Sequence, residues 1–316
     1  MSSEPLGHLL DQLAPGACRI INLPDRIWLF GGKGGFRSET TEPVACESLR
    51  ESFWRQSLAL PFSQSQGQTW SSNIDIPENH PGWWAFSGYD NLLTFERDAC
   101  HLARAVILFP ESPGSLAELG ALAVDDSIVD RLLVVVQSQY LEPDRRESFL
   151  NLGPLKRAEA RQNRCVISAR TPKELPADDF ETVIEFVNAR LPRARNTERL
   201  RAENPTHRLL LIADLVDLLL IVRPNELLAA LHHFGVNISM PELERATKLL
   251  EFFDLVRIDH WGMEHFFVQR RYMSRAWVAY TSNAGRPTFD RSRFKVDRKA
   301  SLITDRRQLA VLERTV

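Results

Sequence analysis

The sequence lacks the features that mark several large classes of protein. Its 316 residues include only four cysteines, which are scattered and form no C-x-x-C pair, so neither a disulfide framework nor a zinc ribbon is indicated. No hydrophobic run approaches the roughly 20 residues that span a membrane as a helix. Residues 1–16 lack the basic-then-apolar pattern of a secretion signal. We therefore expect a cytoplasmic protein with four reduced, mostly buried thiols.

A strong charge of either sign is also missing. The formal net charge is −2, which gives no long-range field that would attract nucleic acid, so any such contact needs a local basic patch. Internal repeats and low-complexity tracts are absent. No H-E-x-x-H or comparable ligand spacing is found among the histidines that cluster near the end of the chain, His232, His233, His260 and His265. We therefore predict no metal site and no bound cofactor.

What the sequence does contain is an alternation of apolar strands and amphipathic helices through residues 1–195. Five strands are expected, at residues 26–30, 73–76, 105–109, 131–136 and 164–168. Because the central strands are apolar throughout, we expect a Rossmann-like, doubly wound parallel sheet with strand order 2-1-3-4-5. That order places the turns after the first and third strands side by side at the switch point, where open α/β sheets bind ligands.

The turn after the third strand has the composition of an anion-binding corner. Pro110, Pro113 and Gly114 stop the strand, and Ser115 is the expected N-cap of a helix over residues 116–124. The N–H groups and the dipole of a helix start attract phosphate. The expected substrate contacts are Pro110, Glu111, Ser112, Gly114 and Ser115, with Gly31 and Gly32 from the turn after the first strand. The glycine cluster at 31–35 is equally consistent with a flexible turn.

Glu118 lies one turn inside that helix, where its carboxylate can face the same space. Two roles fit its spacing equally well. It can act chemically on a bound sugar, or it can form a capping box with Ser115, in which the glutamate folds back onto the helix start and does no chemistry. The position at the carboxyl end of a buried strand favours the chemical role.

The segment Pro-Gly-Ser-x-x-Glu-x-Gly at 113–120 resembles the Ser/Gly-Thr-x-x-Glu-x-Gly signature of the nucleoside 2-deoxyribosyltransferase-like family. The resemblance implies that Glu118 is the catalytic carboxylate at the anomeric carbon of the sugar. It also implies that a carboxylate in the preceding helix, Glu96, positions the sugar or the leaving base. Asp90 is a further candidate for that orienting role.

A closer resemblance is to the effector subunit of type II retrons, which is encoded beside a reverse transcriptase and its multicopy single-stranded DNA. It is carried by Leu29 to Gly32, Leu92, Leu93, Glu96, Ile107 to Ser115, Glu118 to Ala121 and Ser148 to Pro154. The resemblance implies an anti-phage toxin that is held inactive by the reverse transcriptase and its msDNA or ncRNA, in an oligomeric complex without a membrane.

The chemistry of such a site favours an N-glycosidase. Cleaving an N-glycosidic bond builds positive charge at C1′, which a nearby carboxylate stabilises or attacks. Nicotinamide leaves as a neutral base without a strong acid, so NAD is a suitable substrate for a site with one clear carboxylate. Two other functions remain consistent with the sequence: a metabolic nucleoside deoxyribosyltransferase, and a non-enzymatic nucleotide-sensing or nucleic-acid-binding regulator in which Glu118 is only a cap.

An aromatic-rich segment at 77–90 separates the second strand from the next helix. It contains Trp83, Trp84, Phe86 and Tyr89. Such a segment can wall a pocket and stack on a base, or it can be a lid packed on the core. The sequence leaves both interpretations open.

Residues 205–275 predict a winged helix-turn-helix domain, followed by a basic tail at 276–316. Three helices (207–222, 224–231 and 239–253) precede two strands (255–259 and 266–269). The candidate nucleic-acid contacts are Arg245, Lys248, Arg257, Arg270 and Arg271. The third helix also carries Glu242, Glu244 and Glu251, which repel phosphate, so protein–protein docking is an equal alternative. The tail is expected either to clamp DNA or RNA or to be solvated.

Overall fold

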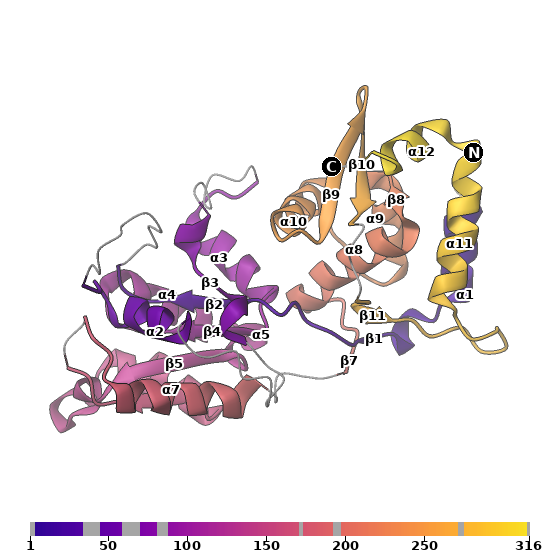
Figure 1. Cartoon of the computed structure of the whole chain (residues 1–316). Helices are drawn as coiled ribbons and strands as arrows, with labels where there is room; N and C mark the ends of the chain where they lie inside the picture. Colours follow the sequence, from indigo (N-terminus) through magenta and orange to yellow (C-terminus); the bar gives the residue numbers. More distant parts are fainter. Residues whose placement is uncertain are drawn as a thin grey trace. The chain divides into compact units, whose positions relative to one another are not determined.

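The computed structural model of the protein describes residues 4–33, 45–58, 70–80, 88–170, 173–191, 197–270 and 275–314. Contacts divide the chain into two units, here called the sheet unit (residues 24–85 and 91–194) and the helical unit (residues 1–23, 86–90 and 195–316) (Figure 1). The first 23 residues and the tail therefore group with the helical unit, whereas the sequence analysis assigned them to the first domain and to a separate tail.

Five parallel strands form the sheet of the sheet unit, in the order β3-β2-β4-β5-β6. They are β2 (Ile27–Phe30), β3 (Ile74–Asp75), β4 (Ala105–Leu108), β5 (Leu132–Gln137) and β6 (Arg164–Ile167). The predicted order 2-1-3-4-5 is confirmed. Every residue of β2, β4 and β5 is buried, which is expected for apolar strands that are covered on both faces.

Helices cover both faces of this sheet. They are α2 (Leu49–Leu58), α3 (Leu92–His101), α4 (Pro113–Ala123), α5 (Asp126–Val129), α6 (Lys156–Ala160) and α7 (Ala177–Arg190). On one face, Leu29 of β2 belongs to a core cluster with Phe53 of α2 and Val183 of α7. On the other face, the Trp28 Nε1–H donates to the carbonyl oxygen of Ala99 in α3 at 3.3 Å. Successive residues of β2 thus serve opposite faces, as the alternation of a strand requires.

The helical unit contains the three helices and the hairpin that the sequence predicted between 205 and 275. These are α8 (Pro205–Leu219), α9 (Pro224–His233), α10 (Met240–Phe252), β9 (Val256–Trp261) and β10 (Glu264–Gln269). A short strand, β8 (Ile221–Val222), adds to the hairpin, so the antiparallel order is β8-β10-β9. A second small sheet of order β11-β1-β7 joins β1 (Arg19–Ile20), β7 (Glu198–Arg199) and β11 (Val278–Ala279), and was not predicted.

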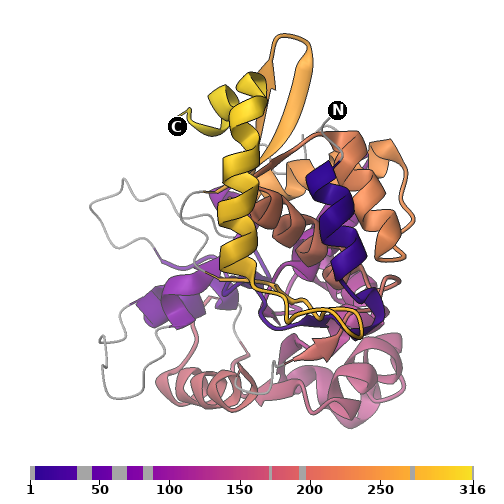
Figure 2. The same cartoon turned by 90° about the vertical axis from the view of Figure 1, so that its right-hand side faces the viewer.

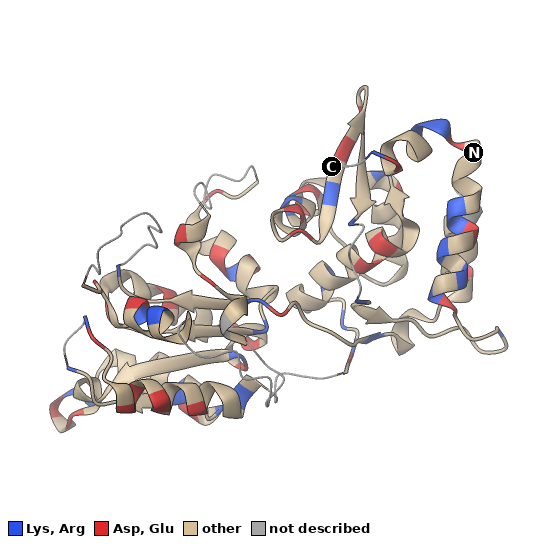
Figure 3. Cartoon of the chain, in the orientation of Figure 1, with Lys and Arg blue, Asp and Glu red and all other residues tan. Residues whose placement is uncertain are grey.

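The basic tail is folded, and this corrects the alternative of a solvated tail; its contact with DNA or RNA stays a prediction. It forms α11 (Arg291–Ser301) and α12 (Arg306–Leu312); Figure 2 shows α11 and the N-terminal helix α1 (Glu4–Gln12) as separate helices of this unit. Three of the positive charges along α11 (Figure 3) are used within the unit. Arg291 bridges Asp214 and Asp217 of α8 at 2.8 and 2.6 Å. Lys295 contacts Asp217 at 2.9 Å. The guanidinium of Arg298 is buried and donates to main-chain carbonyls.

None of the four cysteines is in a disulfide, as expected. Cys18, Cys100 and Cys165 are buried, and burial raises the pKa of each of these thiols, so they stay protonated and unreactive near neutral pH. Cys46 is half-buried. In the part of the chain that the structure describes, no helix is both long enough and apolar enough to cross a bilayer.

The ion pair between Asp214 and Arg291 should hold α11 on α8. The Asp214 side chain is fully buried and also accepts hydrogen bonds from the N–H groups of Trp277 and Val278 at 2.7 and 3.1 Å. Asp214→Asn leaves the Arg291 charge with one carboxylate fewer, so we expect the free energy of unfolding of the helical unit to fall by about 3–5 kcal/mol in urea titrations. Asp297→Asn, at an exposed position of α11, should change it by less than about 0.5 kcal/mol. Equal effects of the two substitutions would contradict this role.

Candidate active site

Helix α4 starts earlier than predicted, and its true start determines whether Glu118 can be part of the cap. Ser112, not Ser115, is the N-cap, and Pro113 is the first helical residue. The Ser115 N–H donates to Ser112 Oγ at 3.1 Å, and the Ser112 N–H donates to Ser115 Oγ at 2.9 Å. Proline suits the first helical position because it has no N–H to satisfy there and its φ is already helical. The capping box is therefore made by two serines, and Glu118 has no part in it.

Glu118 presents a carboxylate that the protein itself leaves unsatisfied. Its Oε2 atom is buried and has no hydrogen-bond partner among the described residues. Burial raises the pKa of Glu118 to about 7; the positive charge of Arg50 opposes this rise and the negative charge of Glu78 adds to it. A carboxyl group with a buried, unsatisfied oxygen and a pKa near neutral pH is typical of an acid, base or nucleophile in an active site.

Arg50 and Glu78 form an ion pair beside this carboxylate that sequence analysis missed. Arg50, in the first turn of α2, is 3% exposed, and its two terminal nitrogens contact the two oxygens of Glu78 at 3.0 and 2.7 Å. Glu78 lies in a single 3₁₀ turn (Pro77–Asn79) that follows β3. A forked arginine–carboxylate pair has a fixed geometry, so it holds the arginine charge at one place. No sequence signal marks either residue, because one lies on an ordinary amphipathic helix and the other in a loop.

Glu111 ties the ends of two strands to the start of α2. Its carboxylate accepts N–H groups from Gly32 at 2.9 Å, Leu49 at 2.7 Å and Arg50 at 3.0 Å. Burial raises the pKa of Glu111 above its ordinary value, and these three N–H groups oppose the rise. The carboxylate thus has a structural role as the cap of α2, and its contact with substrate stays a prediction.

Gly31 and Gly32 lie where α2 approaches the end of β2 most closely. A Cβ atom at Gly31 would lie 2.6 Å from Arg50 Cβ, and one at Gly32 would lie 2.9 Å from Ser48 Cβ. Both distances are shorter than any normal packing contact, so the close approach of the helix is sufficient reason for glycine at both positions. Their contact with substrate likewise stays a prediction.

The expected anion-binding corner offers fewer donors than the sequence suggested. The hydroxyl oxygen of Ser115 is buried and accepts the N–H groups of Glu111 and Ser112 at 3.0 and 2.9 Å. These two donors are therefore used within the turn, because the helix starts earlier and brings Ser115 inside it. Pro110, just after β4, is buried and has no N–H to offer. The N–H of Gly114 has no acceptor among the described residues. Gly114 is the remaining donor of the corner for a ligand.

The two further acidic candidates differ in their placement. Glu96 of α3 is 7% exposed. Burial is the largest cause of the raised pKa of Cys100, and the negative charges of Glu96 and Glu118 raise this pKa further. Glu96 and Glu118 therefore lie near the same thiol, where α3 packs against α4. Asp90 is exposed and precedes Asn91, the N-cap of α3, but it groups with the helical unit. An orienting role for either residue stays a prediction.

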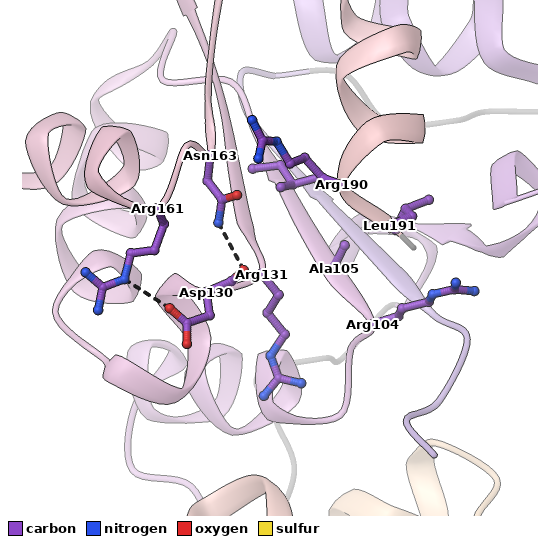
Figure 4. Close-up of a pocket in the computed structure, with 9 residues that line it drawn as sticks. Arg104, Ala105, Asp130, Arg131, Arg161, Asn163, Arg190 and Leu191 are labelled. Carbon is purple, nitrogen blue, oxygen red and sulfur yellow. Dashed lines mark hydrogen bonds and ion pairs between the residues drawn. The ribbon is translucent and has the colours of Figure 1, made fainter. Parts of the chain in front are cut away.

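A small cavity in the sheet unit lies at the opposite edge of the sheet from Glu118. It has a volume of about 110 Å³ and is lined near the first residues of β4 and β5 by Ala105 and Leu133. Arginines also line it, but in Figure 4 their guanidinium groups point in different directions. Arg161 pairs with Asp130 at 3.0 Å, and Arg131 donates to main-chain carbonyls. Because these arginines do not converge, the cavity supports no ligand.

The predicted nucleic-acid contacts of the helical unit are largely engaged within the unit. Arg257 donates to the carbonyl oxygens of Val311 and Arg314 and pairs with Asp259, and Arg270 pairs with Asp254. The guanidinium of Arg245 stacks over the Tyr89 ring, with its central carbon 5.6 Å from the ring centroid. Lys248 lies on α10. Arg271, like Trp83, Trp84 and Phe86, lies outside the described residues. Nucleic-acid contact by these residues stays a prediction.

Metal-ligating side chains do not gather in the described ranges: no group of three or more histidine, cysteine, aspartate or glutamate residues there is arranged to hold a metal ion. The site just described therefore consists of carboxylates, one arginine and main-chain N–H groups.

Comparison with known proteins identifies the family. The model of the family described as "STM3845 retron effector protein" matches residues 46–258, well over half of the chain. The chain belongs to this retron effector family. The effector is also 29% identical over 154 residues to the Escherichia coli "Retron Ec86 putative ribosyltransferase/DNA-binding protein", which covers 48% of the effector and 42% of that relative. It is 37% identical over 67 residues to the Escherichia coli "Retron Ec73 putative ribosyltransferase/DNA-binding protein", which covers 21% of the effector and 20% of the relative. The effector thus matches less than half of the length of either curated relative.

The raised pKa of Glu118 makes the stability of the effector depend on pH. Because the folded pKa of about 7 lies above the ordinary 4.5, the neutral carboxyl favours the folded state, and this stabilisation is lost as the pH rises from about 4.5 through about 7. Glu118→Gln removes the titration. In urea titrations, the free energy of unfolding of the variant relative to that of the wild type should rise by roughly 1–3 kcal/mol between pH 5 and pH 8.

Glu181→Gln is the matched control, because Glu181 is exposed on α7. It should follow the wild type at both pH values. A difference between Glu118→Gln and the wild type that stays constant from pH 5 to pH 8 would contradict the raised pKa.

Proposed function

We propose that this retron effector is an N-glycosidase that cleaves the bond between the base and the sugar of NAD or a related nucleotide, with Glu118 acting at the anomeric carbon. The observation that carries the proposal is the carboxylate of Glu118. One of its oxygens is buried without a hydrogen-bond partner among the described residues, it does not cap its helix, and burial raises its pKa to about 7. It lies just beyond the carboxyl end of β4, at the edge of a doubly wound sheet where ligands bind.

The proposed reaction needs few groups. As the C1′–N bond breaks, its electron pair leaves with the base, and nicotinamide departs neutral without protonation. The ionised Glu118 carboxylate stabilises the positive charge at C1′ or forms an ester with it, and water then completes hydrolysis. Arg50 keeps part of the Glu118 population ionised near neutral pH because it lowers the pKa of that carboxyl group. Glu96 orients the ribose, and the Gly114 N–H binds a phosphate or hydroxyl oxygen.

The fold and the relatives support a wider proposal for the system. The proposal includes a nucleoside deoxyribosyltransferase-like fold for the sheet unit and a winged helix-turn-helix for residues 205–275. The strand order of the sheet, and the three helices followed by a hairpin, support these two parts of it. Both curated relatives carry ribosyltransferase and DNA-binding in their names. In the proposal, the effector is a cytoplasmic toxin that depletes its substrate during phage infection. The reverse transcriptase and its msDNA otherwise hold it inactive in an oligomeric complex.

A second candidate is transfer of the sugar to another base, which the names of the relatives favour. Transfer and hydrolysis share the glycosyl intermediate and differ only in the acceptor that attacks it. Incubation with NAD or deoxynucleosides and an isotopically labelled free base separates them, because transfer incorporates label while hydrolysis does not. The third possibility is a non-enzymatic regulator. The capping role of Glu118 that it was linked to is wrong, because Ser112 and Ser115 form the cap.

Glu118→Gln should lower kcat by roughly 10³-fold, because it removes the charge that meets the transition state. The purified effector, freed of its partners, is incubated with NAD, and nicotinamide and ADP-ribose are separated and quantified by chromatography. Circular dichroism establishes that the variant is folded, and Glu181→Gln should retain wild-type turnover. Hydrolysis by Glu118→Gln at the wild-type rate, or a wild-type protein that leaves NAD and a panel of nucleotides intact, would reject the proposal.

The pH dependence of the reaction should reveal the role of Arg50. Turnover needs ionised Glu118, so kcat should rise with pH around a midpoint near 7. Arg50→Gln removes a charge that lowers the Glu118 pKa, so the midpoint should move to higher pH; Arg50→Lys, which keeps the charge, should move it less. Arg55→Gln, on the same helix but paired with Glu51 at 2.6 Å, is the control and should leave the midpoint in place. A midpoint unchanged in Arg50→Gln would exclude this electrostatic role.

A further inference from the structure

The helical unit contains a groove that takes no part in the proposed function. It has a volume of about 430 Å³ and lies where α9 and α10 begin beside the β9–β10 hairpin. Its principal lining residues are Arg223, Glu226, Met240, Glu244, Met263 and Glu264. We call it the α9–α10 groove. Its volume is within the range of about 300–1,000 Å³ that ligand pockets span.

Three carboxylates, Glu226, Glu244 and Glu264, and one arginine line the α9–α10 groove. The arginine that lines it, Arg223, contacts Asp305 at 3.2 Å, Glu264 at 3.6 Å and Glu226 at 3.7 Å, and Arg307 also pairs with Glu264 at 2.7 Å. On the other side of the groove, Glu244 is exposed and has no ion pair among the described residues. A ligand that enters the groove therefore meets the unpaired carboxylate of Glu244, which favours a cation.

The two helix starts at the groove do not compensate for this charge. A helix N-terminus ordinarily attracts phosphate through its free N–H groups and its dipole. Here the Glu226 carboxylate accepts the Arg223 N–H at 3.1 Å, and the Glu242 carboxylate accepts the Ser239 N–H at 2.7 Å. Each helix is thus capped by its own glutamate, which places a negative charge where a phosphate would have to bind. The groove is therefore unsuited to the backbone of a nucleic acid.

Apolar side chains complete the surface. Met263 is fully exposed at the tip of the hairpin, next to Gly262, whose φ of +59° forms the turn. Trp261, 41% exposed, lies on the same hairpin. Methionine adapts its shape to a partner, and the aliphatic stems of lysine and arginine pack on such residues while their charged ends reach carboxylates. We propose that the α9–α10 groove is a docking site for a basic segment of a protein partner, in which cationic side chains meet Glu244 and their stems pack on Met263.

Fluorescence anisotropy on the full-length effector tests this surface with a defined probe. The probe is a short labelled peptide in which lysine and leucine alternate, and the comparison peptide replaces each lysine with glutamate. We expect the lysine peptide to bind, more weakly at high salt, and the glutamate peptide not to bind. Glu244→Lys should weaken binding by roughly fivefold or more, because it reverses the unpaired charge. Met263→Ser should also weaken peptide binding, and it should reduce the part of the binding free energy that does not depend on salt.

A matched charge change elsewhere distinguishes the groove from general attraction to an acidic surface. Asp297→Lys alters an exposed carboxylate of α11, which does not line the groove, and should leave peptide affinity unchanged. NAD turnover by Glu244→Lys should equal that of the wild type, so failure of the docking proposal and failure of the glycosidase proposal are separable. Equal losses in Glu244→Lys and Asp297→Lys would overturn the proposal. So would duplex DNA that binds to the wild type and displaces the peptide.

Discussion

Two serines close the start of α4, and the candidate site depends on that arrangement. Ser112 and Ser115 exchange hydrogen bonds and also satisfy the N–H groups of the turn that follows β4. A capping side chain is worth about 1 kcal/mol to a helix. Because the serines provide it, Glu118 is left inside the protein with a buried oxygen that no described residue satisfies. Such a group costs stability wherever it is ionised, and proteins retain this cost mainly at functional sites.

The charges around Glu118 come from the ends of neighbouring strands. Arg50 begins the helix after β2, Glu78 follows β3, and Glu111 follows β4 and holds the start of α2. The parallel order of the sheet brings these strand ends to one edge. Arg50 lowers the pKa of Glu118 while Glu78 and burial raise it, so the carboxyl group is balanced near neutrality. The same topology that stabilises the fold thus sets the chemistry of the site.

The sequence predicted the features that depend on local pattern. Apolar runs were sufficient to locate β2, β4 and β5 and to give the strand order, because strands buried on both faces leave few other arrangements. The N-cap of α4 was expected at Ser115, but it is Ser112. Pro113 was the available signal, since proline favours the first helical position and points to Ser112 as the N-cap.

Long-range pairs could not be predicted in this way. Arg50 and Glu78 are separated by 28 residues, and each has an ordinary local context. Arg291 and Asp214 are 77 residues apart, so the basic composition of the tail gave no indication that a buried aspartate would hold it. Composition reports the number of charges in a segment, and only the fold determines which partner each charge finds.

A titration of the Glu118 carboxyl group by carbon-13 NMR tests the central claim most directly. With selectively labelled glutamate, the signal that is lost in Glu118→Gln identifies the residue, and it is followed from pH 4 to pH 9 with and without a non-hydrolysable analogue of NAD. The account predicts a midpoint near 7 that shifts when the nucleotide binds, because the carboxylate faces the sugar. A midpoint near the ordinary 4.5 that the analogue leaves unchanged would contradict it.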